Sequence, residues 1–275
     1  MKLNVDSPGY VLAFAALVSA LFTGAIMTLH AISEPAAEAA RRLYQERSLV
    51  NVFQLGGDEP PGDARVRELY ARHIRLLDAP LIDPETGLVF NDPNAPAGPT
   101  ARKTYVATKG EGGEVIGYAL PVSGVGFWSR IDAYLAVTPE FDKAIGIVII
   151  RHQETPGLGG RITEPTWREQ FEGLQIGQAV DGKYVHVGGD PPGDDSPRRG
   201  RHVDAVTGAT GTSMAVERFL NESIPAFRRA AVAAGLIERK NLNAGNAENA
   251  EQEKRRVLSP STSALKQVLS TVTNA

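Results

Sequence analysis

The 275-residue sequence contains no cysteine. This absence excludes structural disulfides, cysteine-ligated zinc and iron–sulfur clusters held by this chain alone. An excess of basic charge is also lacking, because 29 Lys and Arg face 32 Asp and Glu. With a formal net charge of −3 and no basic patch, we expect no nucleic-acid partner. The hydrophobic share of 42% and the charged share of 22% are ordinary for a globular protein.

One long segment lacks charge altogether. Residues 10–32 (YVLAFAALVSALFTGAIMTLHAI) contain no Asp, Glu, Lys or Arg. Their only side chain that can titrate near neutral pH is His30. As a helix they span roughly 34 Å, enough to cross a hydrocarbon core of about 30 Å. We therefore expect a short N-terminal segment (1–9) and one transmembrane helix. The alternative is a cleaved signal peptide with Ala37-Glu38-Ala39 as its site, although the apolar part of such peptides is usually about 7–15 residues long.

The remainder predicts an α+β chain, with a mixed α/β domain after a membrane-proximal region of helices and loops. Residues 33–103 form this region, with helices expected at 34–50 and 65–78 and a long loop at 83–103. Residues 104–236 form the second domain, and residues 237–275 a polar tail that is poorly ordered or serves for docking. Short runs rich in β-branched and aromatic residues predict its strands: 104–108, 115–122, 133–137, 144–150 and 184–188. Helices are expected at 164–173 and 213–235, the second kinked or divided by Pro225.

Small residues and hydroxyls gather at 204–213 (DAVTGATGTS), directly before the last predicted helix. Helix N-termini present unpaired N–H groups and the positive end of the helix dipole, which suits a phosphate. Glycine at 208 and 211 lets the backbone approach a ligand closely. Spacing alone nevertheless favours an ordinary helix cap through Thr210, Thr212 or Ser213. A nucleotide-binding P-loop is excluded because its lysine is missing.

The same stretch resembles the flavinylation motif of bacterial FMN-binding domains, in which a dedicated flavin transferase joins FMN to a threonine through a phosphoester. The motif runs from Asp204 through Thr207-Gly208-Ala209-Thr210. The resemblance implies that Thr210 is the acceptor of covalent FMN and that residues 207–209 adjoin it. Thr207 stands where many members have Ser, and it retains the hydroxyl. The motif also implies that Asp204 helps to position the incoming flavin donor or its metal.

Two further blocks agree with this resemblance. Residues 154–160 (ETPGLGG) are similar to a block of the same domain, found in the NqrC subunit of sodium-translocating NADH:quinone reductases and the RnfG subunit of the Rnf complex. Residues 124–129 (GVGFWS) resemble a third block of the quinone reductase subunit, with Phe127 in place of the more usual Leu. The resemblance implies that Glu154, Thr155, Leu158 and Gly159 line the flavin, while a Pro-Gly turn is the plain alternative. Trp128 and Trp167 either lie near the flavin ring or pack in the core.

Three blocks in the family's order imply a membrane-anchored flavoprotein subunit. It would relay electrons within a sodium-translocating NADH:ubiquinone reductase, with the other subunits, a flavin transferase and membrane lipid as partners. Gly160, where the Rnf type usually has Asp, favours the quinone reductase over the Rnf complex. A non-enzymatic, membrane-anchored binding or assembly protein is the other hypothesis. His152, His186 and His202 show no metal-ligand spacing, so we expect no metal site and no catalytic residue in this chain.

The family places its flavin domain on the periplasmic side of the bacterial inner membrane. The resemblance therefore implies a single-pass anchor with the domain outside the cytoplasm. The Lys and Arg count around residues 10–32 slightly favours the opposite orientation, since Arg41, Arg42 and Arg47 follow the span and Lys2 precedes it.

Overall fold

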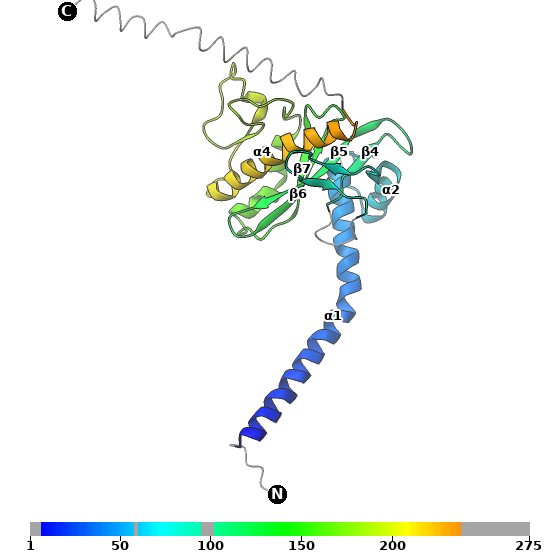
Figure 1. Cartoon of the computed structure of the whole chain (residues 1–275), viewed down its shortest axis with the longest axis vertical. Coiled ribbons are helices and arrows are strands. Elements are labelled where there is room, and N and C mark those ends of the chain that lie inside the picture. Colours follow the sequence, from blue (N-terminus) through cyan, green and yellow to red (C-terminus); the bar gives the residue numbers. More distant parts are fainter. Residues whose placement is uncertain (1–6, 58–59, 95–101, 238–275) are drawn as a thin grey trace, which may run out of the picture.

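A computed structural model describes residues 7–57, 60–94 and 102–237. It begins with one continuous helix, α1 (Pro8–Val52), which starts after Ser7, whose hydroxyl accepts a hydrogen bond from the N–H of Tyr10 at 3.3 Å. The apolar half of α1 has a mean hydropathy of 2.1 over 18 residues, and none of that window is buried in the protein. By length and composition α1 can therefore cross a membrane. Pro35 lies inside the helix, and Figure 1 shows α1 bending along its course toward the domain.

The domain is built on a five-stranded antiparallel sheet with the order β1-β4-β5-β6-β7. Its last four strands occupy the runs that the sequence predicts, and their bounds are β4 (Tyr105–Thr108), β5 (Val115–Val125), β6 (Arg130–Val137) and β7 (Ala144–Arg151). The β5–β6 hairpin is the longest pairing and runs from Tyr118 opposite Val137 to Val125 opposite Arg130. The turn of this hairpin therefore lies at one end of the sheet.

The region before residue 104 contains strands that the sequence did not predict. The helix expected at 65–78 is α2 (Asp63–His73), and the chain then enters β1 (Ile74–Leu76), which pairs with β4. The loop expected at 83–103 contains β3 (Val89–Asn91), which pairs with β2 (Leu81–Ile82). These expectations were wrong because pairing with distant strands, rather than local composition, decides the conformation of such short segments. The domain boundaries given above stay predictions.

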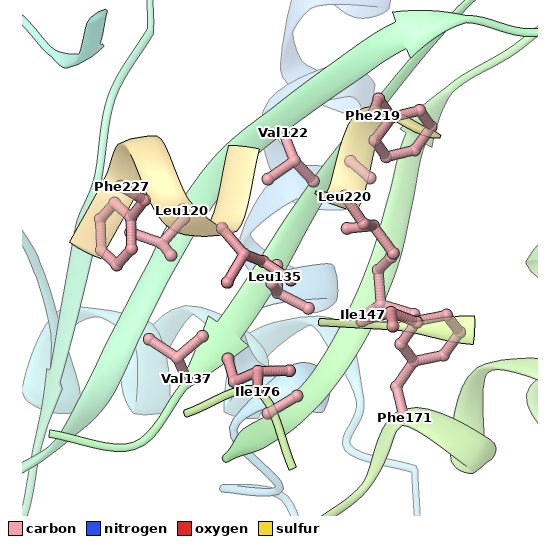
Figure 2. Packing of buried hydrophobic residues seen from close by; sticks show 14 of the residues in the cluster. Leu120, Val122, Leu135, Val137, Ile147, Phe171, Ile176, Phe219, Leu220 and Phe227 are labelled. Atoms are coloured by element: carbon pink, nitrogen blue, oxygen red, sulfur yellow. The ribbon is translucent and has the colours of Figure 1, made fainter. Parts of the chain in front are cut away.

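Helices cover both faces of the sheet. α4 (Thr210–Ala233) packs on one face, where Phe219, Leu220 and Phe227 meet Leu120 and Leu135 of the central strands (Figure 2). α4 passes Pro225 without a break. The last turns of α1 and the helix α2 cover the other face, so that the core there includes Leu49, Val50, Val66, Tyr134 and Ala136. The helix that leaves the membrane thus ends as part of the hydrophobic core.

The chain between β7 and α4 is mostly irregular. It contains two 3₁₀ turns (Gly159–Thr163 and Glu169–Phe171) on either side of α3 (Pro165–Arg168). The helix expected at 164–173 corresponds to α3 and the second of these turns. A third 3₁₀ turn (Arg199–Arg201) precedes the second strand of a short parallel pair, β8 (His186–Val187) and β9 (His202–Val203). Apart from Ile237, the predicted tail 237–275 lies outside the described residues.

A buried ion pair joins the β2–β3 hairpin to the far end of α4. Asp83 is fully buried, and its two carboxylate oxygens accept hydrogen bonds from Nε and Nη2 of Arg229 at 2.9 and 2.7 Å. The side chain and N–H of Thr86 also donate to Asp83. Hydrogen bonding to Arg229 holds the pKa of Asp83 well below its usual value. Asp83 therefore favours the folded state whenever it is ionised.

Replacing this carboxylate gives a test of the fold. We expect Asp83→Asn to lower the free energy of unfolding by about 3 kcal/mol, because Arg229 would lose its buried partner. Because the pKa is depressed in the folded state, the contribution of Asp83 is complete above the unfolded pKa of about 3.9 and declines as the pH falls below it. Urea unfolding of the full chain in detergent between about pH 3 and pH 7 measures both effects. Arg229→Lys keeps the charge without the paired hydrogen bonds and should lose less stability. Equal stability of Asp83→Asn and wild type would contradict the assignment.

Candidate functional site

Three segments that are distant in the sequence meet at one end of the sheet. They are the β5–β6 turn (126–129), the loop after β7 (152–159) and the first turn of α4 with the residues before it (204–213). The strand order explains the first two, because Asp132 near the turn is paired with Arg151 at the end of β7. The third joins them because α4 packs against β5, where Gly124 leaves room for the ring of Phe219.

The Glu154 carboxylate connects all three segments. Its Oε1 accepts hydrogen bonds from the backbone N–H groups of Phe127 and Trp128 at 3.0 and 3.1 Å. Its Oε2 accepts from the hydroxyl of Thr212 in α4 at 2.6 Å. Glu154 is only 4% exposed, so these bonds satisfy a carboxylate that has little access to water. One side chain thus fixes the hairpin turn relative to the start of α4.

Glycines make this arrangement possible. A Cβ atom on Gly126 would lie 2.5 Å from Glu154 Oε1, and one on Gly159 would lie 2.4 Å from Thr212 Oγ1. A Cβ on Gly211 would lie 2.6 Å from the ring of Phe127. Each distance is shorter than a side chain tolerates. One glycine in each of the three sequence blocks therefore has the same steric explanation, which is close packing around Glu154 and Phe127.

Thr210 begins α4 with its side chain exposed. The residue before it, Ala209, is the N-cap, and no side chain caps this helix. The hydroxyl of Thr212 is bound to Glu154, while the hydroxyl of Ser213 donates to the Ala209 carbonyl oxygen and accepts from the N–H of Val206. The structure therefore contradicts the interpretation in which Thr210, Thr212 or Ser213 caps the helix.

The same turn offers donors to a ligand. Within the described residues, no protein acceptor receives the backbone N–H of Thr210, Gly211 or Thr212, and the hydroxyl of Thr210 makes no hydrogen bond. These N–H groups lie at the positive end of a 24-residue helix. Free donors at a helix N-terminus are a common binding site for phosphate groups. The Thr210 hydroxyl thus lies where a bound phosphate would be held.

Four exposed apolar side chains lie beside the neighbours of Thr210 or one helical turn after it, and we call them the apolar rim: Phe127, Trp128, Leu158 and Met214. Their exposed fractions are 64%, 68%, 46% and 62%. The rings of Phe127 and Trp128 meet edge to face with centroids 5.2 Å apart, and the Trp128 indole N–H donates to Thr155 Oγ1 at 3.1 Å. Contiguous apolar groups at a protein surface mark binding sites. The rim and the helix terminus together suit a ligand with an apolar aromatic part and a phosphate.

The structure brings the sequence-predicted residues together. Thr207 and Gly208 are exposed beside Thr210, and Gly208 has a left-handed backbone (φ +77°) close to Leu158. Thr155 and Leu158 are exposed at the rim. Three further residues predicted to lie at the site, Ala209, Glu154 and Gly159, are buried beneath them. The residues that the sequence assigns to the site therefore lie together at one end of the sheet.

Other expectations differ in outcome. Trp167 is a core residue, because it packs against Phe171 and its indole N–H donates to the Asp204 carbonyl oxygen at 2.9 Å. Sequence reasoning assigned no role to Thr212 beyond capping, and it did not select Met214. Thr212 lies inside the motif, and Met214 follows Thr210 by one helical turn. Their positions in the sequence therefore already indicated that both lie near the site.

Two histidines contact the site: His152 Nδ1 accepts the N–H of Glu154 at 3.2 Å, and His202 Nε2 lies 3.3 Å from a carboxylate oxygen of Asp204. His186 and His202 are neighbours in the β8–β9 pair and line a cavity of about 400 Å³ with Lys183, Arg198 and Glu217. Burial lowers the pKa of His186, which keeps its ring neutral near pH 7. In the described part of the chain, no group of three or more His, Asp or Glu side chains is arranged to hold a metal ion.

Comparison with known proteins agrees with this geometry. The family described as FMN-binding domain matches residues 126–224, a range that includes all three segments. The NqrC subunit of the Na(+)-translocating NADH-quinone reductase of Haemophilus ducreyi is 25% identical over 237 residues, covering 78% of this chain and 89% of the relative. The corresponding subunit of Neisseria meningitidis serogroup A is 32% identical over 138 residues, which cover 49% of this chain and 52% of that protein.

A solved structure gives the same result. The crystal structure of Shewanella oneidensis NqrC matches with a TM-score of 0.52 and 26% identity, over 76% of this chain and 99% of that one. It shares the mixed α/β domain and its antiparallel sheet. The chain is therefore similar to NqrC proteins in sequence and in fold, and its residues 126–224 match the FMN-binding domain family.

Proposed function

We propose that this chain is the FMN-carrying subunit of a sodium-translocating NADH:ubiquinone reductase, and that its FMN is joined to Thr210 by a phosphoester. The coarser part of this statement, an FMN-binding electron-transfer subunit, follows from the family. The observation that supports Thr210 is its exposed and unbonded hydroxyl at the start of α4, inside the family's motif. The relatives described above are all NqrC proteins, which favours this assignment over RnfG.

The helix terminus accounts for the phosphate. The ester forms when Thr210 Oγ1 bonds to the phosphorus of the flavin donor, the hydroxyl loses its proton, and the bond from phosphorus to the donor's leaving group breaks. The free N–H groups of the first turn lie within the same turn as this oxygen and favour the negative charge of the product. Asp204, exposed at the start of the motif, is available to a flavin transferase during this step.

The apolar rim accounts for the ring system. Bound FMN supplies one- and two-electron redox chemistry, and the protein sets where that chemistry takes place. Phe127, Trp128, Leu158 and Met214 offer exposed apolar surface around the attachment point, and covering that surface with a flat aromatic ring would be favourable. The hydroxyl of Thr155 holds the Trp128 indole in its orientation. The chain thereby fixes one end of the cofactor covalently and the other by contact.

Glu154 acts in this proposal as a positioning residue. It reaches the site through Phe127, Trp128 and Thr212, whose positions depend on its carboxylate. Because Glu154 is buried, it holds the hairpin turn beside α4 and does not itself face the attachment point. Its loss would separate the rim from Thr210.

The membrane arrangement follows the same proposal. α1 anchors the chain as a single-pass helix in the bacterial inner membrane, with the domain on the periplasmic side, where the flavin transferase and the other subunits of the complex would meet it. Residues 10–32 contain no Asp, Glu, Lys or Arg, and His30 is their only histidine, so this helix lacks the charged groups of an ion path and sodium transport falls to the other subunits. Membrane lipid surrounds the span.

Removing the acceptor hydroxyl tests the attachment. When the protein is expressed with its flavin transferase, we expect the intact mass to include one FMN ester and the denatured band to fluoresce. Thr210→Ala should abolish both signals, because no oxygen remains to form the ester. Thr210→Ser keeps an oxygen and should retain measurable flavin. Thr166→Ala, at an exposed threonine outside the motif, is the matched control and should be fully flavinylated. Covalent flavin that persists in Thr210→Ala would refute the assignment.

Variants of Glu154 test its positioning function. Glu154→Ala leaves three donors without their acceptor, so we expect a loss of about 2–3 kcal/mol in stability and at least a tenfold loss in flavin attachment rate. Glu154→Gln keeps an oxygen for both backbone N–H groups and should stay within about twofold of wild type. Leu135→Ala, in the core, is destabilised by a similar amount and should attach flavin normally below its unfolding temperature. Equal attachment rates in Glu154→Ala and Leu135→Ala would show that Glu154 only stabilises the fold.

The absence of cysteine makes the proposed orientation testable. Glu111→Cys places one thiol in an exposed turn of the domain. We expect a membrane-impermeant maleimide to label it when only the outer membrane has been permeabilised. Asn4→Cys, on the other side of residues 10–32, should react only after the inner membrane is also disrupted. The reverse pattern would place the domain in the cytoplasm.

A further inference from the structure

The direction in which α1 meets the sheet determines which end of the domain faces the membrane. The Tyr44 hydroxyl donates to the Ile149 carbonyl oxygen at 3.0 Å, and eight residues later Val52 lies against Gly146 of the same strand. As α1 runs away from residues 10–32, its contacts therefore move backward along β7. The end of β7 at Arg151 is consequently directed toward the part of α1 that can cross a membrane.

The β5–β6 turn extends farther in that direction. Arg151 is paired with Asp132, and beyond this pair the hairpin continues through Val125 and Arg130 to its turn. Figure 1 agrees: the sheet end near the β6 label lies at the lower edge of the domain, on the side toward which the first half of α1 bends. We call residues 125–130 the hairpin tip.

The lengths of helix and strand place the tip near the membrane surface. About 18 Å of helix separates Ile32, the end of the apolar run, from Tyr44. From Tyr44 the path to the tip leads back toward the membrane along two strands. It passes from Ile149 to Arg151 and then from Asp132 to Arg130, a distance of about 13 Å. The difference, about 5 Å, is comparable with a headgroup layer of roughly 5–8 Å on one side of a bilayer.

The side chains of the tip are those of a membrane-interface surface. Val125, Phe127 and Trp128 expose 68%, 64% and 68% of their surface. Trp is typical of the interface because its ring is apolar while its N–H is polar. Phe127 and Trp128 contact each other, Gly211 and Thr155, but most of their apolar surface is left uncovered by the described residues.

A cationic cluster adjoins these apolar groups. Arg130 and Arg151 both bind the single carboxylate of Asp132, at 2.6 Å each, and each arginine is about half exposed. Arg102 joins them through Ser123, whose hydroxyl also accepts from Arg130. By strand alternation, Asp132 lies on the same sheet face as Tyr134, which α1 covers, but closer to the tip, beyond the point where α1 leaves the sheet. Three arginines against one aspartate leave a net positive charge on this face.

We propose that the hairpin tip rests on the phospholipid surface of the membrane that α1 crosses, with Phe127 and Trp128 among the headgroups and Arg130 and Arg151 against lipid phosphates. Lipid is the occupant that the geometry favours because the tip and the span belong to one chain and reach the same level. The positive face complements the anionic phospholipids of a bacterial membrane. Since Gly211 packs on the Phe127 ring, the start of α4 with Thr210 lies beside the tip. This contact is the one that we infer for the chain before flavin attachment, when the rings of Phe127 and Trp128 are uncovered.

Fluorescence of the full chain in vesicles tests the contact. The sequence has two tryptophans, and Trp167 is buried, so a Thr210→Ala, Trp167→Phe variant reports on Trp128 without flavin. In vesicles of phosphatidylethanolamine and phosphatidylglycerol, we expect a headgroup nitroxide to quench this fluorescence by more than half. A nitroxide at the centre of the acyl chains should have little effect. Thr210→Ala, Trp128→Phe retains only Trp167 and is the control that should not be quenched.

Charge reversal and a difference measurement complete the test. Arg130→Glu combined with Arg151→Glu should at least halve the headgroup quenching. If the Trp167→Phe variant fails to fold, two other variants are compared: Thr210→Ala alone, and Thr210→Ala combined with Trp128→Phe. The difference between their fluorescence gives the quenching of Trp128. Trp128 fluorescence that the headgroup nitroxide leaves unchanged would overturn the proposal. So would a tip that cross-links to a membrane subunit of the complex while remaining unquenched by lipid, because its partner would then be protein.

Discussion

The hydrogen bonds of one buried carboxylate hold the candidate site together. Glu154 is 58 residues from Thr212 and 27 from Phe127, yet it binds both. The sheet provides the approximate placement, because it brings the β5–β6 turn and the end of β7 to the same edge. Glu154 then fixes the contact within hydrogen-bond distance. The exposed rim and the free helix terminus therefore depend on a residue that is itself almost hidden from solvent.

The same contact explains why the family's sequence blocks have their composition. Gly126, Gly159 and Gly211 come from three different blocks, and each leaves space that a methyl group would fill with a clash. A resemblance in motif thus corresponds to one packing arrangement rather than to three separate features. This chain and NqrC of Shewanella oneidensis share the fold although only 26% of their aligned residues are identical.

Sequence patterns were sufficient where the signal was local. The charge-free run 10–32, the alternating strands after residue 104 and the helix start near Thr210 all depend on neighbouring residues, and the structure contains each of them. Residues 74–76 and 89–91 were missed because their strand conformation comes from partners elsewhere in the chain. The cap interpretation of Thr212 failed for the same reason. Its hydroxyl has a partner 58 residues away, which spacing within the motif cannot reveal.

The continuity of α1 has a mechanical consequence. The helix runs from Pro8 to Val52 without a loop, and Leu49 and Val50 at its end are completely buried in the domain. When the helix tilts, the sheet therefore tilts with it, because the two are rigidly connected. The domain cannot rotate independently of α1. Pro35, which removes one backbone hydrogen bond, is the joint at which bending costs least. A group attached at Thr210 can consequently change its position relative to the membrane mainly by bending of α1 at Pro35. The stiffness of the helix limits how far it moves.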